Sequence, residues 1–469
     1  MRPVEFDIAA NERWDAVIAG TSFASLFFAL GLPQGSRVLF LEKGERYSHP
    51  ERLKQRGQYG AETFAQHSTA SIDKVWVAHS TFGGNSNCWW GCTPRFHPED
   101  FQLRTRHGAG MDWPVSYNDL EEFYCDAEAV MDIAGGGSDA ALPRSRPFTS
   151  PPHRPSLSDQ KLRETSPLWW AQPTARSNGT RRSRCCGNGV CNLCPIDAKF
   201  TILNSLDQFD RPNFHYLTGW EVRSVARSAG LATGLEARHS SGREATFRGD
   251  MVALGANAIF NAAILLRSGF TNPHLGRNLH EQTSRVVWVD APMQNFHGGT
   301  SITGHGYHFY HGADRSKHAA VLVENWNSPA SIRMEPSKWT QRLVLKLLAE
   351  DMPQADNRIE LKNGDPVIHW RGHHEYGLEG LDRAVSHLQD IIPVPIERIH
   401  LQPHTITEAH IQGTHRMAST AADGVIDKNL RTFECANVYA LGAGAFPTCS
   451  PANPTLTLSA LSLRAGRQI

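Results

Sequence analysis

The chain opens with a regular alternation of hydrophobic and polar segments. Residues 14–42, WDAVIAGTSFASLFFALGLPQGSRVLFLE, predict a buried strand, a tight turn at Gly20, an amphipathic helix and a second strand. Residues 251–268 repeat the pattern, because the apolar run MVALGA precedes the helical stretch NAAILLRS. The sequence therefore predicts an α/β fold built from strand–turn–helix units.

The carboxy-terminal segment predicts another such unit. NVYALGAGAFPT, residues 437–448, is typical of a strand that enters a glycine-rich turn, and residues 450–469 predict a helix opened by Pro454. Asn453 directly precedes that proline, so helix N-capping is one interpretation of it. Residues 357–370 predict a hairpin with Asn363 and Gly364 at its turn.

The turn at Gly20 partly matches a dinucleotide-binding motif. In G-x-G-x-x-G the glycines allow a sharp turn and a close approach of the backbone to a pyrophosphate. Here Gly20 takes the first place, and Ser22 and Ser25 take the other two. Glu42 ends the second strand, where an acidic side chain binds ribose hydroxyls and disfavours a 2′-phosphate. The alternative is an ordinary strand–helix–strand unit.

Composition and charge narrow the class of protein. The chain has 469 residues, and its 47 basic residues balance its 47 acidic ones, which gives no electrostatic reason to expect nucleic acid or an anionic membrane. The chain contains no run of about eighteen apolar residues, so the sequence predicts no membrane span. The amino terminus, MRPVEFDIAANERWD, lacks the pattern of a secretory signal, so we expect a cytoplasmic protein, with periplasmic co-export beside a signal-bearing partner as the alternative.

A cysteine-rich segment, SRCCGNGVCNLCPID, spans residues 183–197. In a reducing compartment, cysteines so closely spaced favour a metal or catalytic site. Zinc matches poorly, because structural zinc sites use paired C-x-x-C units and only one is present. Iron–sulfur ligation often places a proline after the last cysteine, as Pro195 follows here. Free or disulfide-bonded thiols remain the third interpretation.

Six segments resemble the glucose–methanol–choline (GMC) oxidoreductases, flavoenzymes that use FAD to oxidise alcohols and sugars. They are residues 80–101, 113–135, 254–270, 274–279, 409–417 and 437–465. The resemblance implies a Rossmann-like FAD-binding domain made of 12–105, 196–290 and 405–469. It also implies a sheet-and-helix substrate domain made of 106–195 and 291–404, which holds the cysteine-rich loop 185–194.

The resemblance also implies the catalytic residues. His410 falls on the position of the base that takes the hydroxyl proton while hydride leaves the carbon, a step that suits a neutral imidazole. His415 is the competing candidate for that base. Asn453 falls beside the flavin ring, where it would hydrogen-bond the same hydroxyl and orient the substrate.

The cofactor contacts follow from the same resemblance. They are Gly20, Ser22, Glu42, Gly83, Gly84, Asn85, Asn87, Ala256, Gly442, Ala443, Asn453, Pro454 and Thr455. In the pyranose-oxidase-like branch of the family a histidine near residue 88 carries a covalent flavin. Cys88 takes that place here, so we expect non-covalent FAD.

Within this family the adjacent cysteines resemble those of bacterial glucose and fructose dehydrogenase catalytic subunits. Those subunits carry a three-iron (3Fe-4S) cluster that passes electrons from FAD to a cytochrome. The resemblance implies cluster ligands at Cys185, Cys186 and Cys191, with Cys194 as an additional thiol. It also implies a cytochrome as electron acceptor and a small accessory subunit as partners.

The expected function is therefore an FAD-dependent dehydrogenase. It would oxidise a CH–OH group of a sugar, glycoside or polyol by base-assisted hydride transfer, and pass the electrons to a redox partner. One alternative is an oxidase that reduces oxygen to hydrogen peroxide. Another is a non-redox lyase that keeps the GMC fold.

Overall fold

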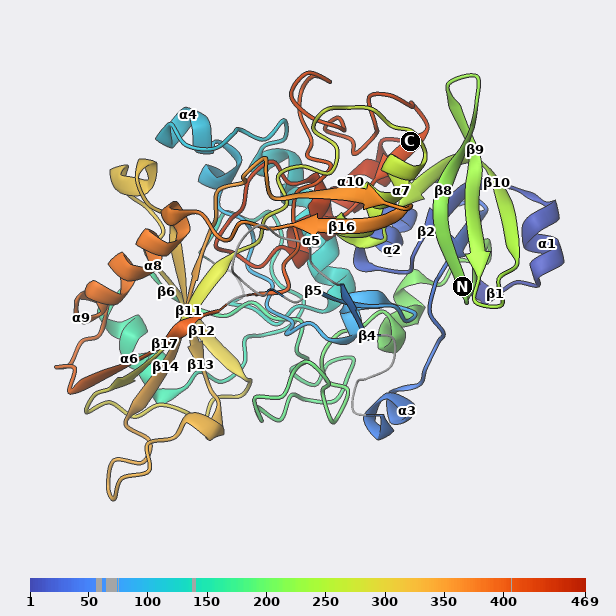
Figure 1. The fold of residues 1–469 in the computed structure, drawn as a ribbon. Helices are drawn as coiled ribbons and strands as arrows, with labels where there is room; N and C mark the ends of the chain where they lie inside the picture. The colour runs from blue at the N-terminus through green and yellow to red at the C-terminus, as the bar shows by residue number, and fades with distance from the viewer. Residues whose placement is uncertain (56–60, 65–73, 75, 137–140, 406) are drawn as a thin grey trace.

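The computed structural model spans residues 1–469 and describes all of them except 56–60, 65–73, 75, 137–140 and 406. Two large sheets lie on opposite sides of the molecule, with the helices α2, α5, α7 and α10 beside the sheet that contains both the amino-terminal strands and β18 (Figure 1). In the part of the chain that the structure describes, every helix is too short or too polar to cross a bilayer. The α/β class predicted from the sequence is confirmed.

The first sheet contains the predicted strand–turn–helix units. Its order is β1-β7-β3-β2-β10-β9-β8, with β18 also paired to β10. The strands β1, β7, β3, β2, β10 and β18 run parallel to one another. β9 runs antiparallel to both of its neighbours, β10 and β8. The strands are β1 (Arg2–Pro3), β2 (Arg13–Ala19), β3 (Val38–Leu41), β7 (Phe214–Leu217), β8 (Trp220–Ser228), β9 (Leu231–His239), β10 (Glu244–Leu254) and β18 (Val438–Ala440). The turns after β2, β10 and β18 therefore meet at one edge, where α/β sheets bind ligands.

Two helices cross tightly over this sheet. α2 (Phe23–Gly31) packs against α10 (Thr455–Arg467). A Cβ atom on Gly31 would lie 2.5 Å from the carbonyl oxygen of Leu463, and one on Gly466 would lie 2.2 Å from that of Phe28. The absence of side chains at these two glycines therefore lets the two backbones touch near the carboxyl ends of both helices.

The second sheet separates an apolar face from a polar one. Its order is β17-β11-β14-β13-β12-β6. The strands are β6 (Trp169–Ala171), β11 (Thr283–Asp290), β12 (Ile302–Phe309), β13 (Val321–Trp326), β14 (Arg342–Ala349) and β17 (Arg398–Thr405). Because side chains alternate along a strand, Val323, Leu345 and Leu347 pack with Leu381 of α8 (Glu375–Ser386), while Glu324 and Lys346 point to the opposite face.

The remaining elements connect these layers. The helices are α1 (Phe6–Asn11), α3 (His49–Lys54), α4 (Leu103–His107), α5 (Tyr117–Met131), α6 (Leu157–Thr165), α7 (Asn257–Arg267) and α9 (Leu388–Ile391). The short sheets are β4 (Ala61–Phe64) with β5 (Trp76–His79) and β15 (Arg358–Lys362) with β16 (Asp365–His369). The last pair confirms the predicted hairpin, whose turn residues Asn363 and Gly364 both have positive φ.

Two segments sit differently from the expected division of the chain. β11 falls inside 196–290, the range expected for the FAD-binding domain, yet it pairs within the second sheet. α5 falls inside 106–195, the range expected for the substrate domain, yet its buried side chains join the core of the first sheet. The segment boundaries themselves stay a prediction.

Candidate active site

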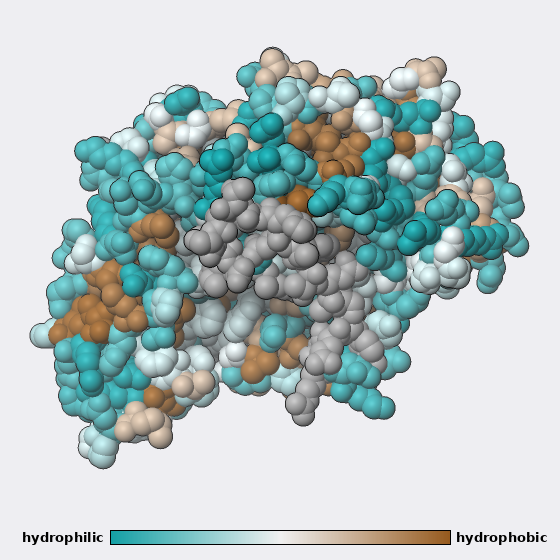
Figure 2. All heavy atoms as spheres, viewed as in Figure 1, coloured by the Kyte–Doolittle hydropathy of each residue, from teal (hydrophilic) through white to brown (hydrophobic). Residues whose placement is uncertain are grey.

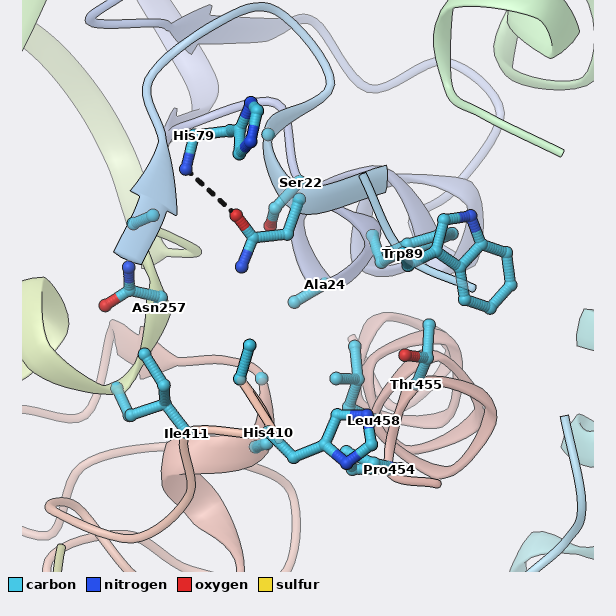
Figure 3. Close-up of a pocket in the computed structure, with 18 of the residues that line it drawn as sticks. Ser22, Ala24, His79, Trp89, Asn257, His410, Ile411, Pro454, Thr455 and Leu458 are labelled. Carbon is cyan, nitrogen blue, oxygen red and sulfur yellow. Dashed lines mark hydrogen bonds between the residues drawn. The ribbon is translucent and has the colours of Figure 1, made fainter. Parts of the chain in front are cut away.

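A cavity of about 480 Å³ lies between the two sheets. Residues from both contribute to its wall, and Figure 3 shows Ser22 and Ala24 on the side opposite to His410, Pro454 and Leu458. Most of the residues expected to bind the cofactor line it: Gly20, Ser22, Glu42, Gly84, Asn85, Ala256, Gly442, Ala443, Asn453, Pro454 and Thr455. Segments far apart in the sequence therefore converge on one site of ordinary ligand-binding size.

One end of the cavity is formed by the turn after β2 and the turn after β10. Gly20 has a φ of +81°, and a Cβ atom there would lie 3.2 Å from the carbonyl oxygen of Gly255. Ser22 caps the amino terminus of α2 and donates from its hydroxyl to the same carbonyl at 2.8 Å. The two turns are thus joined directly, and the amino terminus of α2 opens on the cavity, as an anion-binding site requires.

Glu42 closes this end of the cavity from the tip of β3. Its carboxylate accepts hydrogen bonds from the backbone N–H and the hydroxyl of Thr21, at 3.0 and 2.7 Å, and from the N–H of Gly44 at 3.0 Å. Burial raises the pKa of Glu42, and these hydrogen bonds oppose that change. The side chain sits where a ribose-binding acid is expected after the second strand of the motif.

Two of the expected cofactor residues, Gly83 and Asn87, lie behind the cavity wall instead of in it. The N–H of Gly83 donates to the hydroxyl of Thr21 at 2.8 Å. The side-chain amide of Asn87 donates to Thr81 and to the carbonyl of Phe82, at 3.1 and 2.9 Å. The structure thus uses them to shape the loop that presents Gly84 and Asn85, because their hydrogen-bonding groups are turned inward.

Asn85 and its neighbours form the side wall of the cavity. The side-chain oxygen of Asn85 accepts a hydrogen bond from the N–H of His79 at 3.0 Å (Figure 3). Cys88 lines the cavity, and burial raises the pKa of its thiol. Trp90 also lines the cavity and packs on Trp326 from the second sheet, with ring centroids 4.9 Å apart. This contact joins the two halves of the wall.

His410 is held in one orientation by a buried glutamine. Its Nδ1 contacts the side-chain oxygen of Gln282, a residue at the start of the second sheet that is fully buried. The amide nitrogen of Gln282 donates to the carbonyls of Ser450 and Ala452, at 2.6 and 2.7 Å. Since those carbonyls accept only, the oxygen of Gln282 must face His410. Nδ1 of the imidazole therefore carries the proton, and Nε2 keeps a free lone pair.

The electrostatic surroundings keep His410 neutral. Burial lowers its pKa from the ordinary 6.5 to about 4, with Glu408 acting in the opposite direction and Lys346 in the same one. A neutral imidazole with Nδ1 protonated is a proton acceptor through Nε2. His410 thus has the charge state and the orientation of a general base.

His415, the competing candidate for the base, does not reach the cavity. It is fully buried, its Nδ1 contacts the hydroxyl of Thr414 at 3.1 Å, and its Nε2 lies 3.4 Å from the carbonyl of Leu441. A Cβ atom on Gly444 would lie 1.9 Å from its ring. His415 therefore packs beneath the glycine-rich turn after β18, and the structure brings only His410 to the cavity.

Asn453 meets the cavity from the turn before α10. The N-cap position of that helix is Pro454, and Asn453 makes no side-chain cap hydrogen bond there, so the capping interpretation is wrong. The side chain is 8% exposed, and its oxygen has no hydrogen-bond partner among the described residues. A buried polar atom normally has a partner, so Asn453 has the free hydrogen-bonding group that a ligand would satisfy.

The second sheet supplies a polar wall to the same cavity. Lys346 forms an ion pair with Glu408 at 2.5 Å and lies 5.1 Å above the ring of Trp326. Glu324, the cross-strand neighbour of Lys346, is 2% exposed, and burial raises its pKa. One of its carboxylate oxygens has no partner in the part of the chain the structure describes. These groups are arranged to bind hydroxyl or amino groups of a ligand.

The cysteine-rich loop packs behind Trp90. Arg176 donates to the carbonyl of Trp90 at 2.6 Å and to the hydroxyl of Thr300 at 2.7 Å, and that hydroxyl donates to the sulfur of Cys185 at 3.5 Å. Cys191 is buried and donates to Ser301 at 3.3 Å, and Cys186 is exposed.

The structure does not gather the thiols expected to bind a cluster. Among the described residues, no three of Cys185, Cys186, Cys191 and Cys194 bring their sulfur atoms within 4.8 Å of one another. The sulfur of Cys194 instead accepts the N–H of Ala198 at 3.3 Å. The donor atoms suit an iron–sulfur cluster, but their present arrangement does not.

The turns after three parallel strands, a neutral histidine and an amide whose oxygen has no partner among the described residues line one cavity, a combination that suits a flavin-dependent oxidoreductase. Sequence models of the family described as GMC oxidoreductase match residues 67–284 and 353–462. The chain therefore belongs to the GMC oxidoreductase family and is an FAD-dependent enzyme.

Individual relatives agree with this assignment. The fructose dehydrogenase large subunit of Gluconobacter japonicus is 24% identical, over 82% of this chain and 80% of its own length. The 6'''-hydroxyparomomycin C oxidase of Streptomyces lividus is 26% identical, over 98% of this chain and 92% of its own. Pyridoxine 4-oxidase from Mesorbium loti has the same fold, with a TM-score of 0.71 at 20% identity, over 97% of this chain and 99% of its own.

The residues that the sequence did not reveal are Gln282, Glu324, Lys346 and Glu408. Gln282 lies in the short segment HEQTSR, which carries no periodic signal of a site. Glu324 and Lys346 interrupt otherwise apolar strands, and a charged residue inside a hydrophobic run was the one available signal. That these side chains meet at one cavity depends on strand pairing, which the local sequence does not encode.

Proposed function

We propose that the protein is a dehydrogenase that oxidises a CH–OH group of a sugar, glycoside or polyol and passes the electrons to a redox partner. The observation that carries this proposal is the hydrogen bond between Gln282 and His410, which leaves Nε2 of a neutral imidazole free in the cavity. Such a group accepts the hydroxyl proton of an alcohol.

The cavity suits FAD, because its glycine-lined turns, Ser22 and Glu42 stand where a dinucleotide is held and Asn453 has a free buried oxygen. The bound flavin would supply a hydride acceptor. His410 would take the hydroxyl proton on Nε2, while Gln282 keeps Nδ1–H in place. Asn453 would hydrogen-bond the same hydroxyl and fix the direction of its C–H bond.

The polar wall of the second sheet supports a substrate with several hydroxyl groups. One carboxylate oxygen of Glu324 has no partner among the described residues, and Lys346 and Glu408 offer a donor and acceptors near it. Trp326 provides an aromatic face next to them. A simple apolar alcohol would leave these buried groups unpaired, at a cost of about 1–3 kcal/mol for each.

The cysteine-rich loop is the proposed exit for electrons. Its Cys185 is linked through Thr300 and Arg176 to Trp90 in the cavity wall. Ligation of a 3Fe-4S cluster by Cys185, Cys186 and Cys191 would require the loop to rearrange, and oxidation of the substrate itself needs no step through it. The likeness to a protein named as a large subunit supports an accessory subunit as partner. A cytochrome as electron acceptor is part of the same proposal. Cytoplasmic location, or co-export with such a partner, belongs to the same proposal.

The second candidate is an oxidase that reduces oxygen to hydrogen peroxide. Two observations favour it: the thiols are not gathered in the structure, and a relative that matches 98% of this chain is named an oxidase. A GMC-fold lyase would use the flavin without reducing it.

One experiment separates these functions. The protein is purified without air, its iron and acid-labile sulfide are measured, and sugars, glycosides and polyols are screened for bleaching of the flavin absorption. Bleaching with iron and sulfide present supports the dehydrogenase, and peroxide formed at the rate of substrate oxidation in air supports the oxidase. A flavin that no alcohol bleaches contradicts both and supports the lyase. Iron and sulfide both absent exclude the cluster.

A further inference from the structure

We propose that His97, Glu99 and His311, with His107 beside them, form a binding site for a divalent transition metal ion such as Zn²⁺. One potential ligand atom from each of the first three lies within 4.8 Å of the other two. Among the described residues this is the only group of three histidine, cysteine or acidic side chains that meets that limit. Imidazole nitrogens and a carboxylate are the ligand set of many zinc sites.

The cluster joins segments that are distant in the sequence. His97 caps the 3₁₀ helix η2 (Pro98–Phe101), and His107 ends α4. His311 follows β12 and precedes η4 (Ala313–Ser316). His305, His308 and His311 are spaced by three in the sequence, but among the described residues they do not gather as potential ligands: His305 contacts Gln172 and His308 contacts Ser166. The fold brings only the last of the three to His97.

Glu99 is the centre of the cluster. Its two carboxylate oxygens lie 3.4 Å from Nδ1 of His311 and 3.2 Å from Nε2 of His107. The rings of His97 and His311 meet edge to face, with centroids 4.4 Å apart. His97, His311 and the carboxylate of Glu99 are close enough for small side-chain rotations to bring them to one ion. His107 contacts the other carboxylate oxygen and holds Glu99 in place.

The charged side chains around the cluster favour the binding of a cation. The guanidinium of Arg315 lies 3.7 Å from the carboxylate of Glu99. It is already paired with two buried carboxylates, Asp100 at 2.5 Å and Glu350 at 2.7 Å. These four side chains together carry a net negative charge.

The site is open to solvent and separate from the flavin cavity. His311 is 38% exposed, and none of the four residues lines the cavity. The surface around α4 is largely hydrophilic in Figure 2. The site therefore has no part in the proposed oxidation of substrate.

The expected role of the metal is to stiffen the scaffold of the active-site turn. Asp100, next to Glu99, accepts hydrogen bonds from Tyr310 at 2.6 Å and from Ser450 at 2.8 Å. Tyr310 precedes His311, and Ser450 belongs to the turn that carries Asn453. A bound ion would tie the segment of Glu99 to the segment of His311 a second time. Because the ion would bind only the folded protein, it would stabilise the folded state.

The test is a metal titration of the whole FAD-loaded protein. After treatment with a chelator, wild type and the variants His97→Ala, His311→Ala and His369→Ala are titrated with Zn²⁺ by calorimetry, and the melting temperature is followed. His369→Ala is the matched control, because that half-buried histidine also pairs with a glutamate, Glu360 at 3.0 Å, but belongs to no group of three potential metal ligands among the described residues. Flavin content and circular dichroism show that each variant is folded.

Wild type and His369→Ala should bind one more equivalent of Zn²⁺ than His97→Ala and His311→Ala, and only the first two should melt at a higher temperature in its presence. Zinc held by the cysteine-rich loop adds equally to every protein, so the difference reports the histidine site alone. Equal stoichiometry in all four proteins would overturn the proposal. If His97→Ala does not fold, the comparison with His311→Ala, at the exposed end of the cluster, decides.

Discussion

The side-chain oxygen of Gln282 contacts Nδ1 of His410, while the amide nitrogen of the same glutamine holds the turn that leads to Asn453. One buried side chain thus sets the tautomer of the proposed base and the position of the proposed orienting amide. The two residues proposed to act on the substrate hydroxyl are fixed relative to each other through a third residue that need not touch it.

Replacing Gln282 by leucine should lower kcat/KM about a hundredfold, because His410 loses the acceptor that orients it and the turn loses two donors. Steady-state kinetics with the best substrate would measure this. Gln282→Glu is the informative companion, since a carboxylate there should raise the pKa of His410 and move the acid limb of the pH profile upward. If the acid limb of the Gln282→Glu pH profile lies at the same pH as in wild type, the contact between residue 282 and His410 is contradicted.

The pH dependence should report a neutral base. Because the pKa of His410 is lowered from 6.5 to about 4, kcat/KM should stay level as the pH falls through 6.5 and decline only as it approaches about 4. His410→Ala should lose about a hundredfold to ten-thousandfold in activity while retaining FAD. An acid limb centred near 6.5 would show that burial does not keep this histidine neutral.

Asn453→Ala should lower kcat about tenfold to hundredfold, because one hydrogen bond to the reacting hydroxyl is lost. The effect should fall on the rate of anaerobic flavin reduction more than on KM, since the bond orients the C–H group in addition to binding it. Stopped-flow absorption measures both. A variant that changes KM alone would show that Asn453 only binds substrate.

Glu324→Gln should raise KM for a polyhydroxylated substrate about tenfold, because an amide can offer only one acceptor where the carboxylate offers two. A short alcohol that cannot reach the second sheet is the control, and its KM should not change. Equal effects on both substrates would place Glu324 in support of the fold and not in substrate binding.

Gly31→Ala should lower the free energy of unfolding by about 1–3 kcal/mol, since the added methyl group would meet the backbone of α10 at Leu463. Gly35→Ala is the control, because a Cβ atom there would have no heavy atom within 4 Å. Urea denaturation of the FAD-loaded proteins compares the two. If both variants have the same free energy of unfolding, the α2–α10 contact accommodates the added methyl group without loss of stability.

The sequence predicted the units of the fold well. The strand, turn and helix around Gly20, the strand and helix around Ala256, and the hairpin at Asn363 all form as expected. Each is a local feature, in which hydrophobic periodicity and turn residues specify the backbone within a few positions. Gly83 and Asn87 were expected in the cavity and lie behind it, because a motif does not reveal which way each of its side chains faces.

The candidate site was predicted in part. Composition and motifs favoured His410 over many other histidines only through the resemblance to a family, and they left His415 as its rival. The structure separated the two, because packing of Gly444 against His415 buries one ring while the other reaches the cavity. The cysteine-rich loop left a cluster, zinc and free or disulfide-bonded thiols open, because spacing in the sequence does not determine whether the sulfur atoms converge.

The sequence alone therefore determined the α/β class, the dinucleotide-type turn and the set of reactive side chains, since these depend on residue type and short-range order. Only the tertiary structure decided which of those side chains meet. Gln282 lies 128 positions from His410, and Glu99 lies far from His311 in the chain. Such contacts arise when separate sheets and loops pack together, and packing is determined by the whole core and not by the residues at the contact.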